Sequence, residues 1–236
     1  MVRPNILICA SPKSGSSHIK LLLQKLLRYR SAYAATDNVL YTPAAQVVFE
    51  YDEQILHHHV EATPCNVAIL NRYQDEVKVV LTFRNVLDSL VSMKDYLERP
   101  TVIPPSRMEP GADWARLDDE DKYKWVVYNA TPWYFRFWVQ WKSCDVPRHE
   151  VWYDEFFKDQ VSGIRDILDW VGIDDFYGDD EIAIVSRHRE GKFNVGRSGR
   201  GKELLPKKLI DVVYKNADSW GPYWGSRIRH ELLERS

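Results

Sequence analysis

The chain has 236 residues, of which 44% are hydrophobic and 28% are charged, and its formal net charge is −2. This length suffices for one well-buried domain, so we expect a single domain over residues 1–236. The small net charge gives no electrostatic support for nucleic-acid binding, and no apolar run approaches the ~20 residues of a membrane-spanning helix. Three widely spaced cysteines, Cys9, Cys65 and Cys144, are typical of reduced thiols in a cytoplasmic protein.

The first half of the sequence alternates strand and helix patterns. Residues 5–10 are a short, continuous apolar run, which predicts a strand buried on both faces. A helix is predicted over 17–30 because its apolar residues fall on one face. These residues are Ile19, Leu22, Leu23, Leu26 and Leu27. The next clear strand covers 77–83, and a helix is predicted over 86–97.

The second half contains further strand and helix patterns around irregular stretches. Residues 101–119 are rich in proline and charge, which predicts an irregular surface segment. An aromatic-rich helix is expected over 123–142, interrupted near Pro132. The remaining expected elements are a strand at 150–153, a helix over 161–171 ended by Gly172, a glycine-rich and basic loop at 191–202, and a closing helix over 207–217. Strands separated by helices predict an α/β fold, a three-layer α/β/α arrangement with a central parallel sheet.

The stretch Ser11-Pro12-Lys13-Ser14-Gly15-Ser16-Ser17 joins the first strand to the first helix. Such a turn aims backbone N–H groups and the positive end of the helix dipole at one point, which favours a phosphate. Lys13 adds a mobile positive charge, and the serines add hydroxyl donors. A Walker A motif needs Lys directly after its second Gly, whereas Ser16 follows Gly15 here and Lys13 precedes it. Taken alone, a stretch of this kind is more often an ordinary turn than a phosphate site.

A second polar group follows the 77–83 strand. Arg84 stands at the carboxyl end of that strand, and Ser92 comes eight residues later. A lone Arg would be read as a surface ion pair, but guanidinium also binds phosphate in bidentate fashion. Two anion sites on strand–helix units, without an Asp ending the second strand to hold Mg²⁺, predict a nucleotide phosphorylated at two positions.

Together these motifs resemble the sulfotransferases that use 3′-phosphoadenosine 5′-phosphosulfate (PAPS). Residues 12–17 are similar to the family's 5′-phosphosulfate loop, and 84–92 to its 3′-phosphate motif, with the Arg-to-Ser spacing preserved. Residues 151–156 resemble the family's strand ending in Tyr-Glu-Asp, and 194–202 resemble its late glycine-rich, basic stretch. The four motifs follow the family order and cover most of residues 5–205. The resemblance implies a fold like that of the P-loop nucleotide hydrolases.

The sequence also departs from the family pattern. Val86 replaces the usual Pro, His18 replaces a Trp or other large residue, and Asn194-Val195 replaces an Arg-Lys pair that contacts the 3′-phosphate. The charge and position of nearby basic residues make them candidate substitutes: Arg197, Arg200 and Lys202. The family's dimerisation segment is not recognisable near 202–213, so the oligomeric state stays open.

The resemblance implies an enzyme of the EC 2.8.2 type, which transfers a sulfuryl group from PAPS to a hydroxyl or amine and leaves adenosine 3′,5′-bisphosphate (PAP), with no metal required. Lys13 would stabilise the leaving phosphate. Matching the family's K-x-H pattern makes His59 the general base and places His57 where the family has Lys, with His57 as the other candidate base. The implied PAPS-binding residues are Lys13, Ser14, Gly15, Ser16, Ser17, Arg84, Ser92, Tyr153, Gly196, Arg197, Arg200 and Lys202.

Several other interpretations stay open at this stage. The run His57-His58-His59 is compatible with a metal site, although no Cys or carboxylate pair at ligand spacing accompanies it. Aromatic residues at helical spacing fit core packing or the lining of an acceptor pocket: Trp133, Phe137 and Trp141. A P-loop-like kinase and a non-catalytic nucleotide-binding protein are the alternative functions. For the sulfotransferase we expect a small-molecule acceptor, no nucleic-acid partner, no membrane association and a cytoplasmic location.

Overall fold

The computed structural model describes residues 3–36, 38–40, 42–99, 108–173, 177–187 and 197–235. The chain divides into two compact units that are interleaved along the sequence. Unit 1 comprises Met1–Phe83 and Ser143–Asn194, and unit 2 comprises Arg84–Lys142 and Val195–Ser236. The single domain expected from the sequence stays a prediction. Along the described parts of the chain, none of the helices combines the length and hydropathy that a bilayer crossing requires.

Unit 1 is built on a five-stranded sheet in the order β2-β5-β1-β6-β7, with every neighbouring pair parallel. Its strands are β1 (Asn5–Ala10), β2 (Arg30–Ala32), β5 (Gln54–His58), β6 (Val77–Phe83) and β7 (Arg148–Trp152). After β1 the chain adds strands on one side of it, and then crosses to the other side for β6 and β7. In open parallel sheets such a switch in strand order marks the place, at the carboxyl ends of the strands, where ligands bind.

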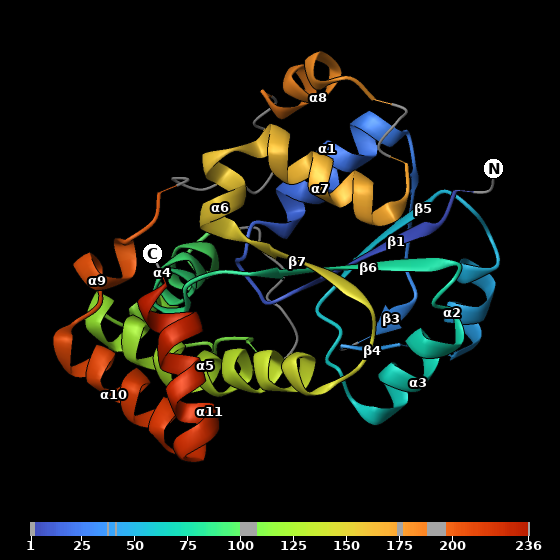
Figure 1. Cartoon of the computed structure of the whole chain (residues 1–236). Helices are drawn as coiled ribbons and strands as arrows, with labels where there is room; N and C mark the ends of the chain where they lie inside the picture. The colour runs from blue at the N-terminus through green and yellow to red at the C-terminus, as the bar shows by residue number, and fades with distance from the viewer. Residues whose placement is uncertain are drawn as a thin grey trace. The chain divides into compact units, whose positions relative to one another are not determined.

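Helices lie on both sides of this sheet, which confirms the predicted α/β class. Figure 1 shows α1 and α7 on one side, and α3 with a small hairpin on the other. The helices of unit 1 are α1 (Ser16–Leu27), α2 (Thr42–Phe49), α3 (Pro64–Arg72), α6 (Tyr153–Lys158), α7 (Gln160–Val171) and α8 (Asp179–Ser186), and the hairpin joins β3 (Ala35–Thr36) to β4 (Val39–Leu40).

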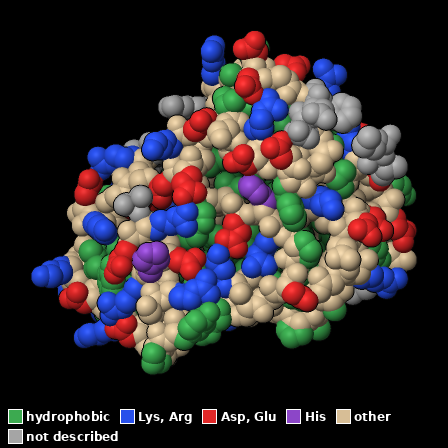
Figure 2. Space-filling model, viewed as in Figure 1, with side chains coloured by type: hydrophobic (Ala, Val, Ile, Leu, Met, Phe, Trp, Pro, Cys, Tyr) green, Lys and Arg blue, Asp and Glu red, His purple; other side chains and the backbone are tan. Residues whose placement is uncertain are grey.

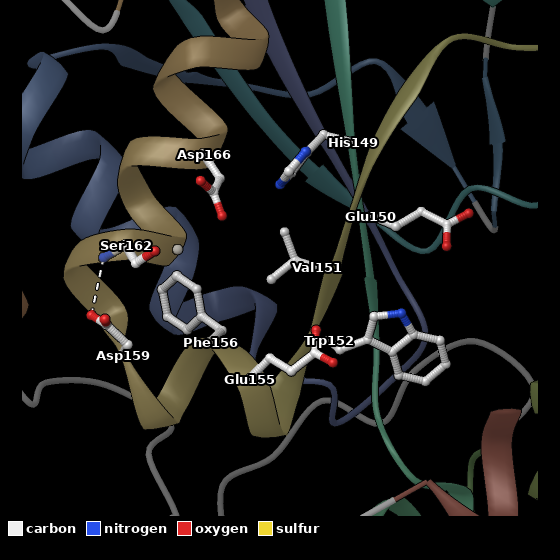
Figure 3. A pocket seen from close by; sticks show the side chains of 10 residues that line it. His149, Glu150, Val151, Trp152, Glu155, Phe156, Asp159, Ser162 and Asp166 are labelled. Atoms are coloured by element: carbon white, nitrogen blue, oxygen red, sulfur yellow. Dashed lines mark hydrogen bonds between the residues drawn. The ribbon is translucent and has the colours of Figure 1, made fainter.

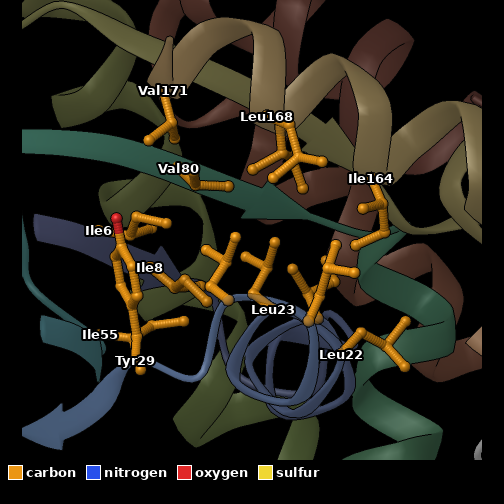
Figure 4. Close-up of a cluster of buried hydrophobic side chains, with 14 of the residues drawn as sticks. Ile6, Ile8, Leu22, Leu23, Tyr29, Ile55, Val80, Ile164, Leu168 and Val171 are labelled. Atoms are coloured by element: carbon orange, nitrogen blue, oxygen red, sulfur yellow. The ribbon is translucent and has the colours of Figure 1, made fainter. Parts of the chain in front are cut away.

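The core of unit 1 lies between the sheet and the helices α1 and α7 (Figure 4). All six residues of β1 are buried, as the continuous apolar run predicted. Ile6 and Ile8 face the helices, and so does Val80 of β6. Leu23 of α1 and Leu168 of α7 meet them and are both 0% exposed. Burying a Leu or Ile side chain contributes about 1.5–3 kcal/mol to the stability of the fold. The packing of this layer therefore holds β1 and α1 in place on either side of the turn that joins them.

The described part of unit 2 is helical. Its elements are α4 (Val86–Leu97), a 3₁₀ turn (Trp114–Arg116), α5 (Asp119–Ser143), α9 (Arg200–Leu204), α10 (Lys207–Asp218), α11 (Gly221–Ile228) and a terminal π-helical turn (Arg229–Glu234). Trp138 lies at the centre, with the Arg227 guanidinium 5.2 Å from its ring and the ring of Trp224 at 5.8 Å. Three aromatic residues for which the sequence left core packing and pocket lining open are buried there: Trp133, Phe137 and Trp141.

Two predicted helices have different limits in the structure. The helix expected over 17–30 ends at Leu27, because Arg28 adopts a left-handed conformation (φ 60°) and Arg30 already begins β2. The predicted interruption near Pro132 is wrong, since α5 runs unbroken through it. A proline inside a helix costs ~3 kcal/mol or more. The buried residues on either side of Pro132 offset this cost: Val126, Val127, Ala130, Thr131, Trp133, Tyr134 and Phe135.

Three other boundaries also differ. The strand expected at 150–153 is β7, which ends at Trp152, so Tyr153 begins α6 instead. Within the expected loop at 191–202, residues 191–196 lie outside the described residues and 200–202 form the start of α9. In the irregular segment at 101–119, residues 101–107 also lie outside the description, and Asp119 begins α5.

The surface carries mixed charge. Figure 2 shows Lys and Arg side chains interspersed with Asp and Glu side chains over the face that it presents. This mixture agrees with the formal net charge of −2. Any site for an anionic ligand on this chain therefore depends on local groups rather than on a field from the whole surface.

Candidate functional site

The turn between β1 and α1 has the geometry of an anion-binding loop. Lys13 (φ 65°) and Gly15 (φ 81°) both adopt left-handed conformations, and α1 begins directly afterwards at Ser16. The amide groups of a first helical turn have no carbonyl partner in the helix, and the helix dipole is positive there. Ser17 is exposed on this turn, whereas Ser16 is buried. The carboxyl end of β1 therefore leads into a turn that contains Lys13 and the first amides of α1.

Ser14 holds this turn against the neighbouring strand. Its hydroxyl lies 2.7 Å from the Ser11 carbonyl oxygen and 2.6 Å from the hydroxyl of Thr82 on β6. The Ser14 amide also donates to the Ser11 carbonyl, at 3.3 Å. Since Ser14 is only 1% exposed, its side chain shapes the loop from inside. The sequence predicted a hydroxyl donor to the ligand at this position and gave no sign of the link to β6.

Gly15 is required at its position for two independent reasons. Its φ of 81° is in the region that residues with a Cβ rarely adopt. A Cβ there would also lie 2.8 Å from ring atoms of both Tyr153 and Phe157. Those two rings lie against each other, with centroids 4.3 Å apart. Tyr153, which the sequence predicted to be adjacent to the ligand, is thus placed directly behind the loop.

Three consecutive histidines lie at the carboxyl end of the neighbouring strand β5, of which His57 and His58 are the last two residues and His59 the residue directly after. The Ser16 hydroxyl lies 2.8 Å from Nε2 of His57, and Nδ1 of His59 lies 2.7 Å from the Ala10 carbonyl oxygen at the end of β1. A carbonyl can only accept, so Nδ1 of His59 carries a hydrogen, and in the neutral ring Nε2 is the basic nitrogen. The rings of His57 and His59 are 6.0 Å apart. Both candidate bases therefore lie beside the β1–α1 loop.

His58 lies between them in sequence but has a different environment. Its Nε2 accepts a hydrogen bond from the Ala34 amide at 3.4 Å, and its ring packs edge-on against Tyr33. Burial, with smaller contributions from His59 and Lys20, lowers the pKa of His58 to about 4. His58 is therefore neutral at physiological pH, and it does not share the contacts of His57 and His59 with the loop.

His18, which replaces the large residue expected after the loop, is buried at 5% exposure. Its ring stacks on Phe157 with centroids 5.3 Å apart, and its Nε2 lies 3.0 Å from Oε1 of Gln160. Both partners come from the α6–α7 region. This histidine therefore helps to fix α1 against that region.

In unit 2, Arg84 directly follows β6 in the chain and is 6% exposed. Its guanidinium donates to the Arg197 carbonyl at 3.1 Å and lies 3.9 Å from the Asp88 carboxylate. The next residue, Asn85, caps α4 by accepting from the Leu87 amide at 3.0 Å. Arg84 is thus oriented by the segment at 197–201 of its own unit.

Asp88 organises this segment, a role that the sequence did not reveal. Its two carboxylate oxygens accept hydrogen bonds from the amides of Gly199 (2.8 Å) and Gly201 (2.6 Å). Gly201 packs so closely on α4 that a Cβ would lie 2.4 Å from the Leu87 backbone. Asp88 is 3% exposed. In the sequence it looks like an ordinary acidic residue in a first helical turn, and no local pattern connects it to glycines more than 100 residues away.

The remaining predicted donor-binding residues are dispersed in unit 2. Ser92 is buried two turns along α4. Arg197 pairs with Glu203, and Arg200 pairs with Asp95 at 2.9 Å. Lys202 is exposed and has no ion pair within the described residues. Gly196 lies outside the described residues.

A separate cavity of about 170 Å³ lies between β7 and the helices α6 and α7 (Figure 3). His149 and the carboxylates of Glu155 and Asp166 are among its lining residues. Burial lowers the pKa of His149, and Asp166 and Glu150 partly counteract this effect. None of the predicted site residues lines this cavity, so it is separate from the loop site.

No metal site accompanies the histidines in the part of the chain that the structure describes. There, no group of three or more His, Cys, Asp and Glu side chains is placed to hold a metal ion. The hydrogen bonds of His57 and His59 run instead to Ser16 and to the Ala10 carbonyl.

No protein-family model and no curated protein sequence matches the chain. Solved structures do match it. Mouse sulfotransferase SULT7A1, complexed with PAP, is 16% identical with a TM-score of 0.67, covering 96% of this chain and 88% of that one. Retinol dehydratase, complexed with retinol and PAP, is 14% identical with a TM-score of 0.60 and coverage of 100% and 84%. A sulfotransferase from Alicyclobacillus acidocaldarius is 16% identical with a TM-score of 0.54 and coverage of 100% and 98%. The chain has the sulfotransferase fold.

Proposed function

We propose that this protein is a PAPS-dependent sulfotransferase that transfers a sulfuryl group to a hydroxyl or amine of a small acceptor. One observation carries the proposal. In unit 1, an anion-binding turn that contains Lys13 lies beside His59, whose Nδ1 is held by the carbonyl of Ala10 directly before that turn. An anion site and an oriented histidine on neighbouring strand ends are the parts that sulfuryl transfer needs.

The residues around the donor have distinct proposed roles. The amides of Gly15, Ser16 and Ser17 bind the 5′-phosphate at the start of α1, and Lys13 neutralises the charge that develops on the leaving phosphate. The Ser14 hydroxyl keeps the turn in shape. The 3′-phosphate is bound by Arg84 and Ser92, and further contacts of the donor are proposed for Tyr153, Gly196, Arg197, Arg200 and Lys202. Among the basic residues of that set, Lys202 is the most available, since Arg197 and Arg200 are held in ion pairs.

The reaction follows from the orientation of His59. Nε2 of His59 takes the proton of the acceptor hydroxyl or amine as the acceptor oxygen or nitrogen bonds to sulfur. The bond between sulfur and the bridging oxygen breaks on the opposite side, and its electron pair stays on the departing PAP beside Lys13. The hydrogen bond to Ala10 stabilises the imidazolium that forms, because a carbonyl accepts a stronger hydrogen bond from a charged ring than from a neutral one.

The acceptor is proposed to be a small molecule. Retinol dehydratase, a structure with the same fold, was crystallised with retinol and PAP. We further propose a cytoplasmic location, since all three cysteines are free thiols: Cys9, Cys65 and Cys144.

Ligand-dependent thermal shift tests the donor class. PAP should stabilise the protein by about 2.7 kcal/mol at 100 times its Kd, and ATP with Mg²⁺ should stabilise it less. Stabilisation by ATP–Mg²⁺ alone would overturn the proposal in favour of a kinase-like protein. Binding of PAP without transfer of labelled sulfuryl to any member of an acceptor library would indicate a non-catalytic nucleotide-binding protein.

The role of Lys13 separates catalysis from binding. Lys13→Ala should reduce turnover far more than it reduces PAP affinity, because the charge beside the bridging oxygen develops in the transition state. Lys215→Ala, at an exposed position on α10, is the control because it also removes one lysine. It should change neither the turnover nor the PAP affinity. Equal losses of turnover and PAP affinity in Lys13→Ala would restrict Lys13 to binding.

A further inference from the structure

We propose that His57 and Ser16 form a proton-linked clamp on the donor. His57 takes up a proton when the anionic end of the donor binds in the β1–α1 loop, and it then supplies the positive charge for which the resembling family uses a lysine. This inference rests on the proposed function, because it requires the loop to bind the donor. It gives His57 a role distinct from that of the base, His59.

The hydrogen-bond partners of the two histidines differ in kind. His59 donates to the Ala10 carbonyl, and this fixes which nitrogen is basic. The partner of His57 is the Ser16 hydroxyl, 2.8 Å from Nε2. A hydroxyl can donate to a neutral ring nitrogen or accept from a protonated one, so both charge states of His57 keep this bond. His57 can therefore gain a proton without losing its contact with the loop.

The charges around His57 couple that proton to the ligand. The ring of His59 is 6.0 Å away, and Lys13 is three residues before Ser16 in the loop. These groups are neutral or positive, so in the empty site they oppose a further positive charge. An anionic donor bound beside Ser16 attracts a positive charge and so favours the protonated form of His57. Because Ser16 is 4% exposed and His57 is half-buried, the attraction is weakly screened by water.

Only one of the two histidines takes up a proton, because a second imidazolium 6.0 Å away is disfavoured. In this proposal the proton goes to His57, since its partner Ser16 belongs to the loop that binds the anionic donor. His59 then stays neutral and remains a base. The two histidines together thus provide one cation for the donor and one base for the acceptor.

Isothermal titration calorimetry with PAP tests the inference. Titrations near pH 7.5 in two buffers with different ionisation enthalpies give the number of protons taken up on binding. We expect a net uptake approaching one proton per site, with the PAP association constant falling by up to about tenfold per pH unit above the histidine range. His57→Lys should bind PAP with this uptake abolished, since a lysine is already charged. Ser16→Ala should reduce the uptake, and His230→Gln, an exposed histidine of unit 2, should leave it unchanged.

The outcomes separate this inference from the proposed function. PAP binding with no proton uptake in the unmodified protein, or with the same uptake in His57→Lys, would overturn the clamp and leave the sulfotransferase proposal standing. Absence of PAP binding at any pH would overturn both. The phosphates of PAP can only release protons on binding near cations, which is opposite in sign to the expected effect.

Discussion

Replacement of Asp88 by Asn tests whether one buried carboxylate holds the segment that orients Arg84. The carboxylate accepts the Gly199 and Gly201 amides at 2.8 and 2.6 Å, one on each oxygen. Asparagine has one acceptor oxygen and one NH₂ group, so one of the two amides must face a donor. A hydrogen bond to a charged group contributes about 1.5–3 kcal/mol, and a neutral one about 0.5–1.5 kcal/mol. Losing one bond and weakening the other should therefore destabilise unit 2 by about 3 kcal/mol.

The chain offers a matched control on the same helix. Asp95 also lies on α4 and also pairs with the 197–204 region, through Arg200 at 2.9 Å. That pair is partly exposed, with 13% and 24% of the side chains accessible, so its contribution is about 0–1 kcal/mol. Asp95→Asn thus removes the same charge from the same helix without touching the two glycine amides.

Two measurements apply to both variants. Hydrogen exchange of the Gly199 and Gly201 amides should accelerate by roughly 100-fold in Asp88→Asn, and by less than about fivefold in Asp95→Asn. The affinity for PAP should fall in Asp88→Asn, whereas the affinity for adenosine 5′-monophosphate, which lacks the 3′-phosphate, should fall less. Equal exchange rates in the two variants would refute the assignment of Asp88 as the organising residue. If Asp88→Asn lost equal affinity for PAP and for adenosine 5′-monophosphate, Asp88 would have no specific effect on binding of the 3′-phosphate.

Three further predictions concern unit 1. His59→Asn should lower kcat by roughly 10² or more at unchanged PAP affinity, since a base acts on the acceptor; a parallel loss of PAP affinity would assign His59 to donor binding instead. Gly15→Ala should lower both the thermal unfolding midpoint and the PAP affinity. At φ 81° an alanine costs about 1–2 kcal/mol, and its Cβ would lie 2.8 Å from a ring atom of Phe157. An unchanged PAP affinity would show that the turn tolerates this strain. Burial and His59 lower the pKa of His58 from 6.5 to about 4, so between these pH values the unfolded chain binds more protons than the folded one. The free energy of unfolding should therefore fall as the pH drops through this window, by up to about 1.4 kcal/mol per pH unit. When the free energy of unfolding is measured with urea at several pH values, His58→Asn should show a weaker dependence on pH than the unmodified protein. An identical pH dependence would contradict the assignment of this effect to His58.

The sequence predicted the elements that frame the site with correct limits. The strand over 5–10, the strand over 77–83 and the helix over 86–97 are all observed with those limits. Each is specified locally: the two strands are short apolar runs buried on both faces, and Asn85 caps the helix through its own side chain. Where neighbouring residues fix an element, its limits can be read from a single sequence.

Boundaries that depend on distant contacts were missed. The helix predicted over 17–30 continues in pattern past Leu27, but Arg30 pairs with Gln54 of β5, and the chain must turn at Arg28 to reach that strand. Pro132 predicts an interruption by its local chemistry, and the burial of the surrounding aromatic helix overrides it. In both cases tertiary packing outweighs a local preference.

The site shows the same division at the level of single side chains. The residue types in the β1–α1 turn predict an anion loop, because the chemistry of Lys, Ser and Gly at a helix start is local. The distinction between His57 and His59 is not local, since it depends on Ser16 and the Ala10 carbonyl, which lie 41 and 49 residues away along the chain. Parallel pairing of β1 with β5 brings these partners into register. In the proposed mechanism, the strand order of the sheet therefore determines which histidine has a fixed tautomer and which can change its charge. A motif read along the sequence does not contain this information.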